Sequence, residues 1–353
     1  MANIYKRLKI ESKMANLRVI ETAIDEVTNM AGIKQDDYGK ILVATLEAVN
    51  NAITHGNKAD PQKIVDVEIK FEESNISITV TDEGPGFDPS TIPDPTKPEN
   101  IEELSRHAAE WMVDYIQKTL LLQDRFTIAL SGGSTPKKLH LLLASAPFRN
   151  RVDWQKLHVF WGDERYVPIT DERNNAKMAF DTLLDHVGVP QSQIHVMRTD
   201  IDPPKSADEY EHILMDYFPA AAAQMEAGTS EQPAEKIHSP HRASFDLVIL
   251  GLGDNAHTLS LFPGEPVIHE EKKWVKSLFV AEVNMERITL TAPVVNMSKR
   301  VAFLVSGQQK AGAVFHVLSD EYSPDLYPAQ VIKPFNGELY WFLDKGAAAR
   351  LPK

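Results

Sequence analysis

The 353-residue sequence contains no cysteine, so it has neither a disulfide framework nor a thiolate nucleophile. Any metal site would have to be built from histidine and carboxylate ligands. Apolar runs fall well short of the roughly 20 residues that span a bilayer, and the first 14 residues lack the apolar core of a signal peptide. We therefore expect a protein of the cytoplasm, without a membrane partner.

A basic block is also missing. Lysine and arginine total 37 against 50 aspartate and glutamate residues, which gives a net charge of −13, and no stretch interleaves basic with aromatic residues. We therefore expect no nucleic acid partner. The apolar fraction of 43% is typical of globular proteins, and the length predicts two domains.

Four prolines between residues 89 and 98 predict a linker over residues 88–100, because proline blocks both helices and central strands. Before it, the apolar spacing predicts a helix over residues 36–56 that ends on Gly56. Residues 64–73 and 75–84 alternate with period two and predict two paired strands. The expected organisation is therefore a domain over residues 1–87, the linker, and a second domain over residues 101–353.

Strand-like runs alternate with helical patterns in residues 101–353, which predicts an α/β fold with a parallel, doubly wound, Rossmann-like sheet. The five runs are RFTIALSGG, LHVFWGDE, FDLVILGLG, RVAFLVSG and ELYWFLD. A polar, proline-containing stretch, residues 228–243, interrupts the pattern, and we expect it to be a mobile surface insertion.

The first run is followed by SGGSTP, which begins at Ser131. Gly132 and Gly133 let the backbone approach an anion closely, and a helix that could begin at Pro136 supplies free N–H groups. The sequence therefore offers a phosphate site here, and a plain turn is the alternative. The next strand ends before Asp163 and Arg165, whose guanidinium could bind phosphate or carboxylate, although a solvated ion-paired loop would have the same composition.

Two further strand ends carry polar groups. Lys310 follows a glycine after the fourth run, where its positive charge at a helix start is unfavourable unless an anion is held there. His257 follows the glycine turn of GLGDNAHTLSLFPG after the third run. An imidazole with a pKa near neutrality could remove a proton from water, although a lone histidine is more often structural.

Residues 101–353 resemble the 6-phosphogluconolactonases along almost their whole length. The resemblance is carried by SGGSTP, WGDERYVP, NNAKMAF, GLGDNAHTLSLFPG, RITLT, SGQQKA and the closing YPAQVIKP and GELYWFLDKGAAARL. It implies hydrolysis of 6-phospho-D-glucono-1,5-lactone to 6-phospho-D-gluconate in the oxidative pentose phosphate pathway. The family uses neither a metal nor a covalent intermediate, so the resemblance implies no cofactor.

The resemblance also implies a role for each matching residue. His257 corresponds to the general base that activates water, and Asp163 to an acidic residue that orients the histidine or the substrate. The matched phosphate contacts are Gly132, Gly133, Ser134, Arg165 and Lys310. Supporting positions are Ser131, Asn255 and Arg287. The expected partner is therefore a small phospho-sugar lactone.

The sequence departs from the family pattern in two places. Asn255 and Ala256 stand where the family has Asp-Gly, so a negative charge beside His257 is lost and a Cβ occupies a position where glycine permits positive φ. The family's first strand is replaced by the linker, which would leave a sheet edge exposed. The glucosamine-6-phosphate deaminases share the fold, but TLSLFPG after His257 favours the lactonases.

Residues 10–100 resemble the histidine-kinase-like ATPase fold, particularly the anti-sigma factor serine kinases, through LEAVNNAITHG and VTDEGPGF. The resemblance implies a partial, two-layer α/β domain in which Asn51 holds magnesium, Glu47 assists hydroxyl activation and Asp82 reads adenine. Gly84 and Gly86 follow. No glycine occurs between Gly86 and Gly132, so the phosphate-covering loop of those ATPases is missing and we do not expect ATP with magnesium to bind.

Two functions of different classes follow. The first is a lactonase with a truncated, fused N-terminal segment. The second is a signalling or interaction protein whose N-terminal half binds a nucleotide or a protein partner, and whose C-terminal half senses a phospho-sugar without turnover. Lactone hydrolysis separates the two.

Overall fold

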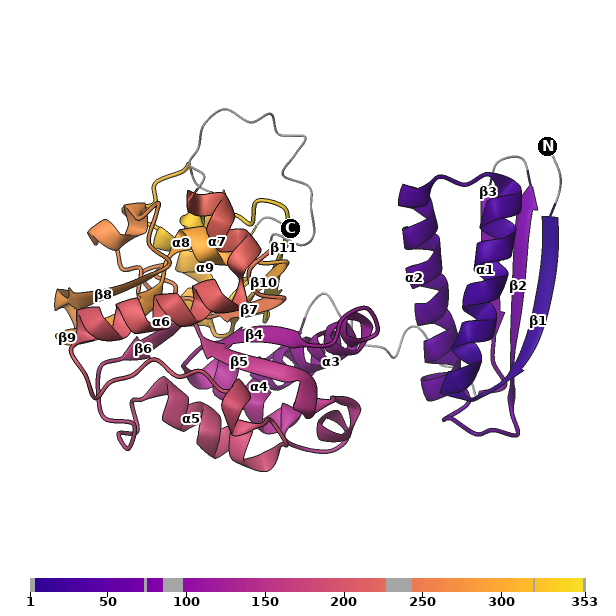
Figure 1. Cartoon of the computed structure of the whole chain (residues 1–353), viewed down its shortest axis with the longest axis horizontal. Coiled ribbons are helices and arrows are strands. Elements are labelled where there is room, and N and C mark those ends of the chain that lie inside the picture. Colours follow the sequence, from indigo (N-terminus) through magenta and orange to yellow (C-terminus); the bar gives the residue numbers. More distant parts are fainter. Residues whose placement is uncertain (1–3, 73–74, 85–97, 227–242, 320, 352–353) are drawn as a thin grey trace. The chain divides into compact units, whose positions relative to one another are not determined.

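The computed structural model describes residues 4–72, 75–84, 98–226, 243–319 and 321–351. The chain forms two compact units, Met1–Ile92 and Pro93–Lys353 (Figure 1). Residues 88–97 of the expected linker and residues 228–242 of the expected insertion lie outside the described residues.

The smaller unit packs two helices on one antiparallel sheet of order β1-β2-β3. Its elements are β1 (Ile4–Glu11), α1 (Leu17–Ala31), α2 (Gln35–Asn51), β2 (Ile64–Glu72) and β3 (Asn75–Thr81). The core consists of a stripe on α1 against the inner face of β2, made of Ile20, Ile24, Val27, Val65, Val67 and Ile69. These residues recur with the helix and strand periods, so one face of each element is buried.

The sequence prediction for this unit is confirmed for the strand pair and corrected for the helix. β2 and β3 pair in register, with Val67 opposite Val80. The helix expected over residues 36–56 is instead α2 followed by a π-helical turn, Ala52–Gly56. Gly56 is not in the left-handed conformation of a capping glycine. β1 and α1 were not anticipated.

The larger unit alternates strands and helices. Its elements are α3 (Ile101–Leu120), β4 (Phe126–Leu130), α4 (Ser134–Leu143), β5 (Leu157–Trp161), β6 (Asp163–Arg165), α5 (Asn175–Thr182), α6 (Pro203–Tyr217), α7 (Pro219–Glu226), β7 (Leu247–Leu250), β8 (Val275–Val280), β9 (Met285–Leu290), α8 (Ala292–Asn296), β10 (Arg300–Val305), α9 (Ala311–Ser319) and β11 (Glu338–Leu343). The five strands expected from the apolar runs form one parallel sheet of order β11-β10-β7-β4-β5.

Both faces of this sheet are covered, as expected of a doubly wound fold. Ile128 of β4 and Leu304 of β10 pack in a cluster with α3, α4 and α5. Their neighbours Ala129 and Phe303 pack in the opposite cluster with α6 and α9. Figure 1 shows the two groups of helices on opposite sides of the sheet.

The strand order locates the site. From β4 the chain moves outward to β5, and it then returns to add β7, β10 and β11 on the other side of β4. The order therefore reverses between β4 and β7, which pair through Ile128 and Leu247. Ligands of open α/β sheets bind beyond the carboxyl ends of the strands at such a switch point. The two segments that leave it are those of Gly132 and His257.

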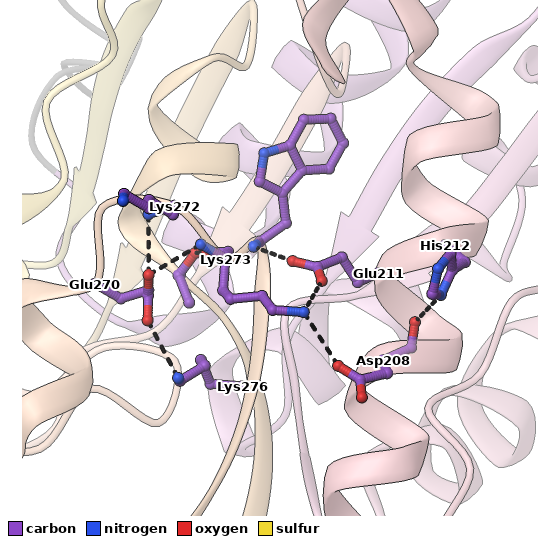
Figure 2. A network of polar contacts seen from close by, with 9 residues as sticks. Asp208, Glu211, His212, Glu270, Lys272, Lys273 and Lys276 are labelled. Carbon is purple, nitrogen blue, oxygen red and sulfur yellow. Dashed lines mark hydrogen bonds and ion pairs between the residues drawn. The ribbon is translucent and has the colours of Figure 1, made fainter. Parts of the chain in front are cut away.

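A second, antiparallel sheet of order β6-β9-β8 was not anticipated. Its outer strand is tied to α6 by the buried Glu211, which accepts hydrogen bonds from the backbone of Trp274 at 2.5 Å and from Lys273 Nζ at 2.7 Å. Figure 2 shows Lys273 reaching α6 between Glu211 and Asp208. This tie fixes the sheet that carries Asp163, Arg165 and Arg287.

Within the described ranges, no helix is both long enough and apolar enough to cross a bilayer. The place of the family's first strand falls on residues outside those ranges, so the exposed edge expected there stays a prediction. Pro98 is buried, and its carbonyl accepts a hydrogen bond from the backbone of Lys345 at 2.8 Å, just after the edge strand β11.

Candidate active site

The glycine loop after β4 lies against the start of α5. Gly133 caps α4 with φ 106°, and α4 begins at Ser134, two residues before the start expected at Pro136. A Cβ on Gly132 would lie 1.9 Å from Asn175 Oδ1, so only glycine fits there. Ser131 is buried behind the loop. The loop therefore presents free N–H groups at the switch point.

Glu164 holds α5 in place beneath this loop. Its carboxylate accepts backbone hydrogen bonds from Asn175 at 2.6 Å, Ala176 at 2.8 Å and Arg165 at 2.8 Å. Burial raises the pKa of Glu164 to about 7, although the three N–H groups favour the charged form. Asn175 in turn donates through Nδ2 to the carbonyl of Asp163 at 2.9 Å. The loop after β4 is thus coupled to β6.

Asp163 is buried, and its Oδ2 accepts a hydrogen bond from Ser260 Oγ at 2.7 Å. Ser260 belongs to the same loop as His257, and its backbone N–H donates to Thr289 Oγ1 of β9 at 3.1 Å. Asp163 therefore joins the loop after β7 to the second sheet. The sequence suggested a solvated loop as one alternative for this segment, and the burial of Asp163 excludes it.

Arg165 and Arg287 are direct partners in the β6–β9 register. The Arg287 side chain is buried, and its Nε has no hydrogen-bond partner in the described chain. Burial lowers the pKa of Arg287, which the Arg165 charge lowers further and the Asp163 charge raises. Arg165 Nη1 donates to the carbonyl of Arg173 at 2.8 Å. The two guanidinium groups form a positive patch with unused donors, which suits an anion.

Lys310 closes the site from the strand beyond β7. It ends a 3₁₀ turn, Gln308–Lys310, directly before α9, and its Nζ forms an ion pair with Asp254 Oδ1 at 2.6 Å. An exposed carboxylate thus occupies the position near Lys310 where the sequence analysis expected an anion. Because Asp254 is 67% exposed, this ion pair is expected to be weak.

The His257 ring contacts three neighbouring residues, Phe262, Gly253 and Asn255. One ring face stacks on Phe262 with centroids 4.0 Å apart. A Cβ on Gly253 would lie 2.0 Å from Nδ1, so the glycine lets the ring sit against the backbone. Nδ1 lies 2.6 Å from Asn255 Oδ1, which also accepts the backbone N–H of His257 at 3.2 Å. Among described residues, none hydrogen-bonds to Nε2.

These contacts set the protonation of the imidazole. The Asn255 oxygen accepts, so Nδ1 carries the hydrogen and Nε2 keeps its lone pair. Burial lowers the pKa of His257 to about 4; the Asp163 charge raises it, and the Lys310 and Arg287 charges lower it. Asp163, Lys310 and Arg287 therefore lie within electrostatic reach of the ring. The side chain is a neutral base at physiological pH.

Ala256 occupies the left-handed region, with φ 62°, at the position where the sequence analysis expected strain. Its methyl group is buried in the core cluster below the sheet edge. This conformation costs an L-residue roughly 1–2 kcal/mol. The loop therefore keeps its shape despite the alanine.

The structure describes four of the five candidate nucleotide residues of the smaller unit. Glu47 and Asn51 lie one turn apart on α2 with exposed side chains. Gly84 N donates to Asp82 Oδ1 at 2.8 Å, and the Asp82 carboxylate packs against Gly56. Gly86 lies outside the described residues.

Sequence reasoning missed several residues that shape the site, namely Glu164, Asn175, Ser260 and Glu282. Glu164 could have been found beside Asp163, and Asn175 in the NNAKMAF motif. Nothing in the sequence pointed to Glu282. In the described chain, no three His, Asp or Glu side chains gather closely enough to bind a metal ion.

Comparison with known families gives two matches. Residues 99–341 match the family described as glucosamine-6-phosphate isomerases/6-phosphogluconolactonase. Residues 10–111 match the histidine kinase-like ATPase domain. The 6-phosphogluconolactonase of Synechocystis sp. is 38% identical over 256 residues, which cover 71% of this chain and 95% of the relative. That of Nostoc sp. is 39% identical over 233 residues, covering 65% and 86%.

Solved structures share the fold of the larger unit. A 6-phosphogluconolactonase from Trypanosoma cruzi matches with a TM-score of 0.58 and 26% identity, covering 73% of this chain and 98% of that one. One from Leishmania guyanensis matches with a TM-score of 0.59 and the same identity and coverage. A monomeric glucosamine-6-phosphate deaminase, at 20% identity and a TM-score of 0.58, shows the common fold alone.

Proposed function

Because this chain belongs to the glucosamine-6-phosphate isomerase/6-phosphogluconolactonase family, we propose that it hydrolyses 6-phospho-D-glucono-1,5-lactone to 6-phospho-D-gluconate in the oxidative pentose phosphate pathway. One observation carries the proposal: a neutral imidazole with a bare Nε2 stands near a pair of arginines, of which Arg287 is buried, at the carboxyl edge of the sheet. That arrangement combines a base with an anion site and includes no strong nucleophile.

The proposed reaction begins with water bound at His257 Nε2. The imidazole takes a proton from the water as its oxygen attacks the lactone C1, and the carbonyl becomes an oxyanion. The intermediate collapses with cleavage of the bond between C1 and the ring oxygen. The imidazolium returns its proton to the departing oxygen, which becomes a hydroxyl group, and the product keeps a carboxyl group that ionises.

The remaining residues bind and orient. We assign the substrate phosphate to the Arg165 and Arg287 pair, together with Lys310 and the N–H groups of the loop after β4. Phosphate binding away from C1 can position the ring and so lower the barrier to attack. Asp163, buried and held by Ser260, favours the imidazolium as it forms, because its charge raises the pKa of His257.

The test is an assay of the purified full-length chain with freshly generated 6-phosphogluconolactone, corrected for spontaneous hydrolysis. Turnover at least a hundredfold above background is expected. Unphosphorylated glucono-δ-lactone should react far more slowly. The same preparation should release no ammonia from glucosamine 6-phosphate; ammonia release without lactone turnover would assign the chain to the deaminases.

A second function has one observation behind it, the match of residues 10–111 to the histidine kinase-like ATPase domain. If the smaller unit binds a nucleotide, Asn51 and Asp82 are the residues expected to contact it. Isothermal titration with ATP and magnesium tests this. Binding in the absence of any lactone turnover would favour a signalling or interaction protein, in which the larger unit binds a phospho-sugar without reaction.

The division into a segment over residues 1–87, a linker over residues 88–100 and a lactonase domain over residues 101–353 is part of the proposal, as is the fusion of the two domains. The cytoplasm is the proposed compartment. Plant relatives from Oryza sativa carry the name of chloroplastic proteins.

A further inference from the structure

We propose that Glu282 is a positioning residue that fixes the reactive tautomer of His257 by orienting the side-chain amide of Asn255. The inference rests on the proposed function for its catalytic consequence. Its structural part concerns only which imidazole nitrogen carries the hydrogen.

Glu282 holds the nitrogen end of the amide. Both carboxylate oxygens accept from Asn255 Nδ2, at 2.9 Å and 3.0 Å. A carboxylate at neutral pH has no hydrogen to donate, so it can face only the NH₂ end of the amide. Glu282 lies in a short turn, Ala281–Val283, between β8 and β9, far from His257 along the chain. The second sheet therefore reaches into the loop after β7.

The orientation of the amide then decides the tautomer. With Nδ2 turned to Glu282, Asn255 Oδ1 faces both the backbone N–H and the Nδ1 of His257, at 3.2 Å and 2.6 Å. A short contact between an acceptor oxygen and Nδ1 requires a hydrogen on Nδ1. Nε2 is therefore the bare nitrogen, which is the one a base needs on the open side of the ring.

The opposite orientation would be unfavourable at each end. Asn255 Nδ2 would point at the backbone N–H of His257, so that two donors would face one another. Oδ1 would meet the Glu282 carboxylate. Without Glu282 only the first conflict remains, and the amide can rotate toward solvent because Asn255 is half-buried. The carboxylate thus supplies the second restraint.

This restraint matters because residue 255 is an asparagine. An aspartate there would accept from Nδ1 with either oxygen and would need no orienting group. It would also repel Glu282, since two carboxylates would replace the present amide-to-carboxylate hydrogen bond. Asn255 and Glu282 therefore form a matched pair, in which an aspartate at position 255 would require a neutral residue at position 282.

Other groups hold the ring but do not choose its tautomer. Phe262 stacks on one face, and Gly253 leaves room for Nδ1. The charges that act on His257 come from Asp163, Lys310, Arg287 and Asp254. Ring stacking and distant charge leave both neutral tautomers possible, so the choice falls to the hydrogen bond from Asn255.

The test compares Glu282→Ala and Glu282→Gln with the parent chain. Imidazole ¹⁵N spectra at pH 7, with His257 assigned by its absence in His257→Gln, report which nitrogen carries the hydrogen. The parent should show the Nδ1–H form only. Glu282→Ala should show a mixture and lose three- to tenfold in kcat with KM nearly unchanged. Glu282→Gln keeps an acceptor for Nδ2 and should retain most of the activity.

A charge swap gives the sharper result. Asn255→Asp alone should lower kcat about tenfold, and adding Glu282→Gln should recover most of that loss, because the new amide can donate to the new carboxylate. Glu286→Gln, on the neighbouring strand, is the matched control and should leave kcat unchanged. Equal activity of the single and double variants, or an unchanged ¹⁵N spectrum in Glu282→Ala, would overturn the inference.

The two readouts separate this inference from the proposed function. If the chain hydrolyses no lactone but Glu282→Ala still mixes the tautomers, the positioning role stands and the lactonase proposal fails. If hydrolysis is robust and the spectra do not respond, the positioning role fails alone.

Discussion

Arg165 stands directly opposite Arg287 across the antiparallel pair β6–β9, so two guanidinium groups share one end of the second sheet. Like charges placed opposite one another destabilise a strand pair. Arg287 is also buried, with an unpartnered Nε in the part of the chain that the structure describes. A phosphate between them would supply the missing acceptor. The pair is therefore expected to cost stability in the free protein, as would suit the phosphate-binding role proposed for it.

Replacing Arg287 with methionine should raise KM for 6-phosphogluconolactone about 10- to 100-fold, because a charge-assisted hydrogen bond contributes about 1.5–3 kcal/mol. The unfolding midpoint should not fall, since a buried and incompletely paired charge is removed. Arg149→Met, at an exposed position, is the control. Steady-state kinetics with phosphorylated and unphosphorylated lactones measure the effect. An equal rise in KM for both substrates would contradict the assignment.

The pH dependence of kcat/KM should reflect the lowered pKa of His257, about 4. Protonation removes the lone pair on Nε2, so activity should be lost as pH falls through that value and should persist at pH 5. Asn255→Asp adds a negative charge and should move the acidic limb upward. Initial rates between pH 3.5 and 8, corrected for spontaneous hydrolysis, give the profile. A limb centred at pH 6 or above would conflict with the burial of the ring.

Acid stability should depend on His140, which is fully buried on α4 and has a pKa lowered by burial to about 4. Between pH 6.5 and 4 the unfolded chain binds a proton at this residue that the folded chain does not. The free energy of unfolding therefore decreases as the pH is lowered through this range. The contribution is at most about 3 kcal/mol. His140→Gln should flatten the pH dependence by that amount.

This effect can be measured by urea denaturation at several pH values. All five tryptophans lie in the larger unit, so their fluorescence reports its unfolding without a contribution from the smaller one. Parallel curves for the parent and His140→Gln would show that His140 carries no such linkage.

Glu164→Gln should lower the free energy of unfolding of the larger unit by about 1–3 kcal/mol. Three backbone N–H groups donate to the carboxylate, and an amide offers only one oxygen while its NH₂ faces a donor. Because Asn175 links α5 to Asp163, kcat should fall as well. Glu172→Gln, at an exposed position before α5, is the comparison, and an equal effect of the two changes would argue against this role.

The sequence predicted the five parallel strands because each contains a short apolar run. The runs of β4, β5, β7 and β10 are buried on both faces, whereas the edge strand β11 is partly exposed. A buried strand must consist mostly of apolar residues, which makes it recognisable in the sequence. Ile128 and Phe303 both lie in strands of this kind. The loops after them were also predictable, since Gly132 and His257 follow strand ends directly. Their convergence follows from the parallel order of the sheet.

The second sheet could not be predicted in the same way. β6 has only three residues, Asp163, Glu164 and Arg165, and all three are charged. Its position depends on pairing with β9, more than 100 residues later in the chain. The role of Glu282 could not be predicted either. Its contact with Asn255 joins residues far apart in the sequence, and its exposed turn has no distinctive composition. The burial of Arg287 likewise requires the folded context.

The central claim is that His257 activates water against a phosphorylated lactone. The most direct test is kcat of full-length His257→Gln against the parent, with His212→Gln as the control on an exposed part of α6. The account predicts that kcat falls 10²- to 10⁴-fold with KM little changed, which is the usual contribution of a general base. Hydrolysis by His257→Gln at the parent rate would contradict it.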